Sequence, residues 1–233
     1  SAQRASLTER YGVHDDRLTA ALELMESHPG EPLKRSETAR RIGLSTRQLD
    51  RLFSEKLGAS YAEHYRQTRL ERARDLLRAE FVSRAGWGDA GERLLAGDAS
   101  FRRYFRVSHA DKGNAILMDA PPPHEDPKPF IDVAQYLTGQ GFRAPVIYGK
   151  DLTRGLVLIE DFGDRRMREH LDAFPADEEK IYRRAIDTII ALSKSTCADL
   201  PPYDEAVYLR EVRLLAEWYM PAMRLDFDPA EFD

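Results

Sequence analysis

The sequence predicts an α+β chain, in which an all-helical bundle at the N-terminus is followed by an antiparallel sheet with helices. Residues 15–78 carry apolar side chains at helical spacing, between clearly marked helix starts and stops. Residues 101–161 contain short runs rich in β-branched and aromatic residues, separated by turn residues. From residue 177 the helical spacing returns. The 233 residues are enough for two modest domains.

Composition indicates a soluble globular protein, with 42% hydrophobic and 32% charged residues. No apolar run approaches the roughly 20 residues that a membrane span needs, and no signal peptide is recognisable at the start. The single Cys197 excludes an internal disulfide framework and fits a reducing cytoplasm. We therefore expect a cytoplasmic protein. Ser1 in place of Met is expected of a fragment or a processed chain.

Charge differs between the two parts of the chain. Residues 1–80 hold 15 Lys and Arg against 13 Asp and Glu, and the remainder holds 20 against 27. The net charge of −5 does not exclude nucleic-acid binding, because the local field decides such contacts.

The first two helices are defined by their ends. Asp15 or Asp16 can cap a helix whose apolar face comprises Leu18, Ala21, Leu22 and Met25. The segment "HPGEPL" breaks this helix. Ser36 begins a short helix that runs through Ile42, and Gly43 ends it.

Two capping boxes mark the next two helices. Ser45 with Gln48 opens the first, which Gly58 ends and whose buried stripe comprises Leu49, Leu52, Phe53 and Leu57. Ser60 with Glu63 opens the second, which we expect to run to about Arg78. Its apolar side comprises Ala62, Tyr65, Ala73 and Leu77.

Residues 79–92 are Gly-rich and turn-like, and we place the domain boundary there. The strands are predicted at "FRRYFRVSH", "NAILMDA", "APVIYG" and "GLVLIED". The Pro-rich "APPPHEDPKP" is a loop. A helix follows it, with inward residues Phe130, Val133, Ala134 and Leu137. The later helical stripes comprise Ile181, Ala185, Ile189 and Leu192, then Val212, Leu215 and Trp218.

The segment "SETARRIGLSTRQLDRLF" has the pattern of a helix-turn-helix. Gly43 permits the turn, and Leu44 and Leu49 fill the angle between the helices. The outward face of the second helix carries Thr46, Arg47, Gln48 and Arg51, which suit base edges in the major groove. Phosphate contacts are expected from Arg40, Arg41 and Arg69, with Lys34 and Arg35 nearby. The alternative is a small helical bundle with a solvated charged face.

Residues 2–78 closely resemble the first half of the AraC-type DNA-binding domain, through "GLSTRQLDRLFSEKLG" and "RLERARDLL". The resemblance implies that Thr46, Arg47, Gln48 and Arg51 lie on the first recognition helix, that double-stranded DNA is the partner, and that no cofactor is needed. The family's second helix-turn-helix should begin near residue 80. Glycines in "DAGERLLAGDAS" would break its recognition helix, so we expect one reading unit with weak affinity.

Residues 79–233 resemble aminoglycoside-phosphotransferase-like kinases, through "LAGDASFRRY", "ILMDAPP" and "LIEDFGD". The most similar branch phosphorylates cell-wall amino sugars such as N-acetylmuramate and N-acetylglucosamine. The resemblance implies a truncated protein-kinase-like lobe. The turn over the nucleotide phosphates would comprise Gly97, Asp98, Ala99 and Ser100. The hinge that holds adenine would comprise Ile159, Glu160, Asp161 and Phe162.

The kinase pattern is incomplete in this sequence. Met118 stands where relatives often carry a phosphate-binding lysine, and Arg102 or Arg103 could compensate. No H-x-D-x(4)-N loop follows the hinge, so we assign no catalytic or metal-binding residue. ATP and Mg²⁺ are expected only if this part is functional. The partial matches at residues 109–114 and 170–177 are interpreted as turn and helix features.

The preferred hypothesis is a sequence-specific DNA-binding regulator module, residues 1–78, fused to a kinase-like lobe, residues 79–233. An alternative is an ATP-dependent amino-sugar kinase, inactive without its catalytic loop. A third is a join made by an error of gene assembly, which predicts no continuous gene across residues 75–95. A truncated lobe would also expose apolar surface around Val212, Leu215 and Trp218 and favour association.

Overall fold

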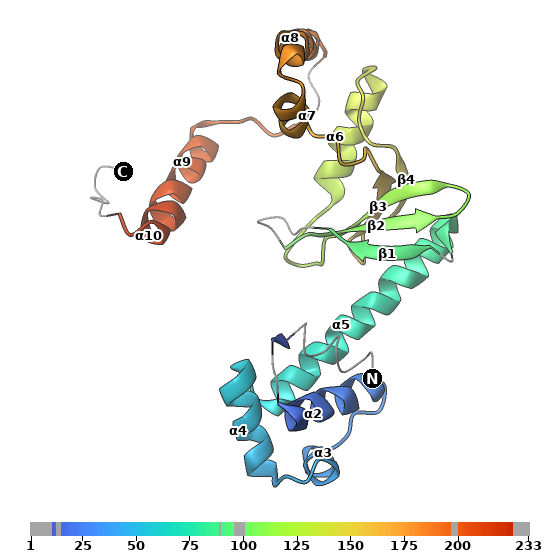
Figure 1. Ribbon diagram of the computed structural model, residues 1–233. Coiled ribbons are helices and arrows are strands. Elements are labelled where there is room, and N and C mark those ends of the chain that lie inside the picture. Colours follow the sequence, from blue (N-terminus) through green and yellow to red (C-terminus); the bar gives the residue numbers. More distant parts are fainter. Residues whose placement is uncertain (1–10, 13–14, 89, 96–100, 197–199, 226–233) are drawn as a thin grey trace. The chain divides into compact units, whose positions relative to one another are not determined.

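The computed structural model describes residues 11–12, 15–88, 90–95, 101–196 and 200–225 (Figure 1). The chain divides into two compact units, Ser1–Gly163 and Asp164–Asp233. The first unit contains a helical bundle and an antiparallel sheet, and the second contains helices. This α+β architecture confirms the predicted fold class.

The bundle comprises α2 (Asp16–Ser27), α3 (Arg35–Arg41), α4 (Thr46–Leu57) and the first half of α5 (Tyr61–Val82). Asp15 caps α2, since its carboxylate accepts from the backbone N–H groups of Arg17 and Leu18 at 2.9 and 3.0 Å. The helix α3 begins one residue earlier than predicted. Gly43, at φ 71°, forms the turn into α4.

Both predicted capping boxes are present, at Ser45 with Gln48 and at Ser60 with Glu63. Gly58 ends α4 in the left-handed conformation, at φ 69°. The predicted apolar face of α2 is buried and packs with α4 and α5 in one cluster: Leu18, Ala21, Leu22, Met25, Ala39, Leu49, Phe53, Tyr61 and Tyr65. Local capping chemistry therefore places α4 as predicted.

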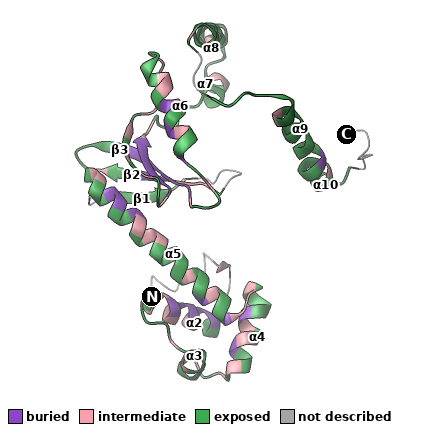
Figure 2. Cartoon of the chain, turned by 180° about the vertical axis from the view of Figure 1, so that it is seen from behind, coloured by how far each residue is buried: buried purple, intermediate pink, exposed green. Residues whose placement is uncertain are grey.

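The helix α5 is longer than predicted and continues past residue 78 to Val82, before a π-helical turn at Ser83–Trp87. Ala62 and Ala73 are exposed rather than inward. The reason is that α5 has two different partners. Tyr61 and Tyr65 pack in the bundle, whereas the buried residues near its other end pack on the sheet (Figure 2). The division of domains at residue 78 remains a prediction.

The sheet has the order β1-β2-β3-β5-β4, and every neighbouring pair is antiparallel. Its strands are β1 (Gly91–Leu94), β2 (Arg103–His109), β3 (Gly113–Asp119), β4 (Ile147–Asp151) and β5 (Leu156–Glu160). Four strands confirm the prediction. The strand β1 lies in the segment predicted as turns. It was missed because a four-residue exposed edge strand carries no alternating apolar pattern.

The two faces of the sheet are covered by different helices. On one, termed the α5 face, Phe105, Val107, Ala115, Leu117, Leu156 and Leu158 pack with Phe81, Val82 and Trp87. On the other, termed the α6 face, Met118, Ala120, Val157 and Ile159 pack with Ile131 of α6 (Lys128–Gly139). Ala134 is buried as predicted, and the other predicted inward residues of α6 are half-buried. Ile131, which was not predicted, is the most buried residue of this helix.

The second unit contains α7 (Met167–Ala173), a 3₁₀ turn (Pro175–Asp177), α8 (Glu178–Ser193), α9 (Glu205–Leu214), a π-helical turn (Leu215–Tyr219) and α10 (Met220–Ala222). The predicted helices are present, but their apolar stripes are largely exposed. Ile189 is 65% and Trp218 73% exposed, and Val212 and Leu215 are also open. The expected exposure around Val212, Leu215 and Trp218 is confirmed. No helix in the described ranges is long and apolar enough to span a bilayer.

Candidate nucleic-acid interface and nucleotide site

The helix α4 presents its predicted reading face to solvent. Leu49 and Phe53 are fully buried and fix the inner side of the helix. Arg47, Gln48 and Arg51 are exposed on the remaining side, and Thr46 is half-buried. This is the disposition that a recognition helix needs, with rigid packing on one side and polar side chains on the other.

The four residues are not equally available. The amide oxygen of Gln48 accepts from the backbone N–H of Ser45 at 2.9 Å and from its hydroxyl at 3.0 Å. A bidentate contact with adenine needs that oxygen, so base reading by Gln48 competes with the cap. Arg51 lies 3.7 Å from Glu55 in an exposed ion pair that contributes little. Arg47 makes no ion pair within the described ranges, so Arg47 and Arg51 are the available readers.

The predicted phosphate contacts also differ. Arg40 is exposed and makes no ion pair in the described part of the chain. Arg41 pairs with Glu37 at 2.6 Å, and Arg69 donates to the backbone oxygen of Pro29 at 2.9 Å. Arg35 is bound to Asp50 at 2.7 Å. Arg40 is therefore the readiest phosphate contact.

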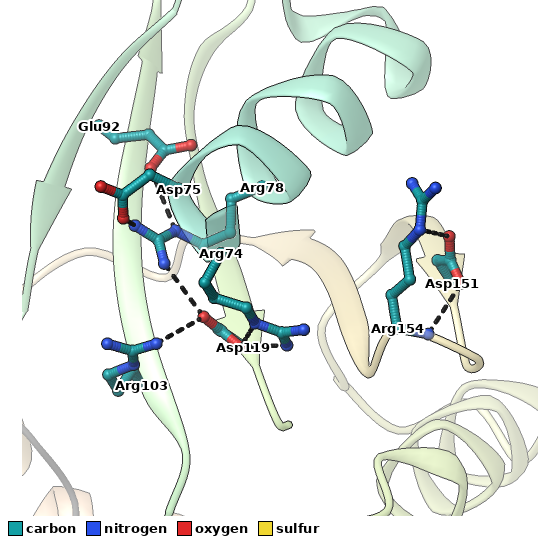
Figure 3. A network of polar contacts seen from close by, with 8 residues as sticks. All are labelled: Arg74, Asp75, Arg78, Glu92, Arg103, Asp119, Asp151 and Arg154. Atoms are coloured by element: carbon teal, nitrogen blue, oxygen red, sulfur yellow. Dashed lines mark hydrogen bonds and ion pairs between the residues drawn. The ribbon is translucent and has the colours of Figure 1, made fainter. Parts of the chain in front are cut away.

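An ion-pair network ties α5 to the sheet (Figure 3). Its centre is Asp119, at the end of β3, whose side chain is fully buried. Arg74 donates to one carboxylate oxygen through Nε at 2.8 Å and through a second, shorter contact. Arg78 and Arg103 approach the other oxygen at 3.2 and 3.3 Å. Two of these three guanidinium groups come from α5, so the helix is fixed to β3 by charge.

Arg78 extends this network toward β1. Its guanidinium donates to Asp75 at 2.6 Å, lies 3.5 Å from Glu92, and stacks over the Phe105 ring at 4.0 Å. Burial raises the pKa of the Glu92 carboxyl, and Arg78 opposes that rise in part. Arg78 thus links α5 to three strands, through Glu92, Phe105 and Asp119.

The predicted phosphate-covering turn, Gly97, Asp98, Ala99 and Ser100, lies outside the described residues. Directly after it, the N–H of Phe101 donates to Glu125 at 3.2 Å, and Arg102 donates to the same carboxylate at 2.8 Å. The Phe101 ring stacks on His124, with centroids 5.0 Å apart. The Pro-rich loop therefore holds the chain where it enters β2.

Arg102 or Arg103 was expected to compensate for the missing lysine. Met118 is fully buried in the apolar cluster of the α6 face and brings no charge there. Arg103 donates to Asp119 at 3.3 Å, beside α5. Arg102 is held by Glu125. Both arginines therefore have carboxylate partners within the protein, and the compensating role stays a prediction.

The predicted hinge is tied down by its own side chains. Arg143 donates to both carboxylate oxygens of Glu160, one at 2.7 Å, and lowers the pKa of that carboxyl. The guanidinium of Arg143 also covers the ring of Phe162, at 4.6 Å. Asp161 is paired with Arg106. Ile159 lies in β5 and packs in the α6-face cluster. The side chains of Glu160, Asp161 and Phe162 are thus engaged within the protein, and the backbone N–H of Glu160 donates to Val146 at 2.9 Å.

Sequence reasoning missed Arg106, which donates to the two oxygens of Asp161 at 2.6 and 3.2 Å. Its backbone neighbours in β2, Phe105 and Val107, are buried on the opposite face. A charged residue between the apolar Phe105 and Val107 was the available signal. Its partner could not be read from the sequence, because the two residues are 55 positions apart.

The partial matches to a catalytic loop have structural roles. His109 accepts from the backbone N–H groups of Asp111 and Lys112 at 3.1 and 3.3 Å, so it closes the β2–β3 turn. His170 contacts Asp177 at 2.8 Å, next to the start of α8. Among the described residues, no group of three or more His, Cys, Asp or Glu side chains could hold a metal ion.

Comparison with known proteins divides the chain near residue 91. The family model of the phosphotransferase enzyme family matches residues 91–233. A helix-turn-helix domain model matches residues 38–92. An N-acetylmuramate/N-acetylglucosamine kinase of Pseudomonas aeruginosa is 41% identical over 140 residues, which are 58% of this chain and 40% of that protein.

The helix-turn-helix part has different relatives. The regulator GlxA of Rhizobium meliloti is 46% identical over 81 residues, which are 35% of this chain and 25% of that protein. An AraC-type regulator from Chromobacterium violaceum, known as a crystal structure, is 45% identical, with a TM-score of 0.26, over 27% of this chain and 55% of that one. The chain spans about 40% of the length of the curated kinase and about a quarter of the length of GlxA.

Proposed function

The chain belongs to the phosphotransferase enzyme family. We propose that it is a sequence-specific DNA-binding regulator, in which α4 reads the bases and α5 joins the helical bundle to the sheet of a kinase-like lobe. The observation that carries the proposal is the exposed pair Arg47 and Arg51 on α4, opposite the buried Leu49 and Phe53. The likeness to AraC-type regulators supports double-stranded DNA as the partner.

Binding is expected to be weak and dependent on salt. A single reading module buries a small interface, and phosphate contacts release counterions. Replacing Arg40 by alanine should reduce the slope of log affinity against log salt by about 0.9, for the one lost phosphate contact. Sequence preference should not change, because phosphates carry no base identity. Fluorescence anisotropy at several salt concentrations measures both quantities.

The matched control is Arg183→Ala in α8. Arg183 is exposed and bound to Glu179 at 2.7 Å, in the second unit. The control removes the same charge outside the proposed interface. If wild-type protein and Arg40→Ala show the same slope of log affinity against log salt, Arg40 does not contact a phosphate.

A second candidate function is ATP-dependent phosphorylation of an amino sugar. It is favoured by the 41% identity to a kinase named for N-acetylmuramate and N-acetylglucosamine, and by the hinge-like end of β5. The 233 residues contain no H-x-D-x(4)-N pattern, and the described residues offer no metal-binding cluster. These residues do not fit a catalytic Mg²⁺ site, so we expect nucleotide binding without phosphoryl transfer.

Incubation with labelled ATP, Mg²⁺ and N-acetylmuramate tests this expectation. Product should stay at the level of a protein-free control. Sugar phosphate formed above that level, in proportion to the protein added, would show that the chain is an active kinase.

A further inference from the structure

We propose that Arg106 is a positioning residue for nucleotide binding, because its ion pair with Asp161 fixes the hinge against the sheet. The inference rests on the nucleotide binding proposed above and adds a residue that neither the predicted phosphate turn nor the predicted hinge includes. The charged group that holds Asp161 therefore comes from β2.

The ion pair crosses a whole strand. Arg106 is the register partner of Ile116 in β3, and Ile116 is the partner of Ile159 in β5. Asp161 lies two residues beyond Ile159 and therefore continues the same face. Since β3 separates β2 from β5, the Arg106 side chain passes over β3 on the α6 face to reach the hinge.

The pair is almost closed to solvent. The side chains of Arg106 and Asp161 are 10% and 6% exposed. One carboxylate oxygen accepts from Nε of Arg106 at 2.6 Å, and the other accepts from Nη2 at 3.2 Å and from the N–H of Gly163 at 2.8 Å. The carboxylate therefore holds both β2 and the residue that follows the hinge. Such buried pairs contribute more to geometry than to net stability.

A hinge that binds a nucleobase does so through backbone groups, which must lie within a few tenths of an ångström of their productive positions. Within the described residues, the side chains of Glu160, Asp161 and Phe162 already contact other protein groups. The backbone at Asp161 is thus the part left to meet a ligand, and Arg106 determines where it lies. Ile116 and Met118 give the adjoining sheet surface its apolar character.

The chain offers an internal control one residue away. Arg143 holds Glu160 by a similar two-point ion pair, but its side chain is 66% exposed. Because solvent screens an exposed pair, its loss should move the hinge less. Arg106→Met and Arg143→Met remove the same charge from the carboxylates of adjacent hinge residues, one buried and one exposed, and Arg143→Met also removes the contact with Phe162.

Isothermal titration of the full chain with ADP, together with thermal unfolding without ADP, tests the inference. We expect Arg106→Met to weaken ADP binding by about tenfold, within the range of coupling found for residues in contact. Arg143→Met should change the dissociation constant less than about threefold. Asp161→Asn should resemble Arg106→Met, and the double variant should bind no more weakly than either single variant.

The measurements distinguish failure of the positioning role of Arg106 from failure of the nucleotide-binding proposal. An Arg106→Met protein that melts earlier but binds ADP as wild type does would show a purely structural role and overturn the inference alone. Wild-type protein that binds no ADP would overturn both the nucleotide proposal and this inference. If Arg106→Met does not fold, Arg106→Lys keeps the charge but loses the two-point contact, and it should still weaken binding. Unchanged binding in Arg106→Lys would then refute the positioning role.

Discussion

Replacing Asp119 by alanine is expected to destabilise the Ser1–Gly163 unit by about 3–5 kcal/mol, the usual cost of leaving a buried charge without its partner. The variant removes the carboxylate that Arg74, Arg78 and Arg103 share. Arg78 would keep Asp75 and Glu92 as partners. Arg74, whose side chain is 16% exposed, has no other ion-pair partner among the described residues and would be left without one. The free energy of unfolding, measured with urea, gives the effect directly.

The matched control is Asp132→Ala. Asp132 is likewise an aspartate in an ion pair, but it has a single basic partner, Lys128, and its side chain is 50% exposed. Its loss should cost less than about 1 kcal/mol. If Asp119→Ala costs no more than Asp132→Ala, charge does not hold α5 on the sheet.

The double variant Arg47→Ala plus Arg51→Ala is expected to abolish sequence preference in DNA binding. Each good bidentate contact with a base discriminates by about 1–3 kcal/mol, and both side chains are exposed on the reading face of α4. Residual binding should persist through phosphate contacts, at equal affinity for all duplexes. Gel-shift titrations with a preferred duplex and a scrambled one measure the preference.

A second double variant distinguishes the effect of losing two positive charges from the effect of losing two base-contacting side chains. Arg183→Ala plus Arg184→Ala removes the same charge from exposed positions of α8. This control should keep the ratio of affinities for the two duplexes. An unchanged ratio in the Arg47 and Arg51 variant would mean that α4 does not read bases.

The helix α5 gives the two modules a common element. Tyr61 and Tyr65 belong to the core of the bundle, and Phe81 and Val82 belong to the core of the α5 face. Cutting the chain at residue 78 would divide this helix between the two parts. Residues 1–78 expressed alone are expected to fold as a helical bundle, because they contain its whole core. In the remaining part, α5 would be shortened, and the sheet would lose part of its apolar cover.

The bundle could be predicted from the sequence because its signals are local. Ser45, Gly58 and Ser60 mark helix ends by chemistry that operates within three or four residues. The strands β2 to β5 were predictable for a similar reason, since their apolar runs are bounded by turns. The short exposed strand β1 gave no such signal.

The missed features depend on tertiary contacts. The continuation of α5 beyond residue 78 follows from burial of Phe81 and Val82 against the sheet. The roles of Asp119 and Arg106 follow from ion pairs between residues 16 to 55 positions apart. Such pairs depend on strand order, which residue types alone do not specify.

Selection of duplexes from a random pool by the intact chain tests DNA reading most directly. We expect enrichment of one short half-site motif, and we expect the Arg47→Ala plus Arg51→Ala variant to enrich none. Retention of DNA without any enriched motif, at low salt and with the wild-type chain, would contradict sequence-specific reading by α4.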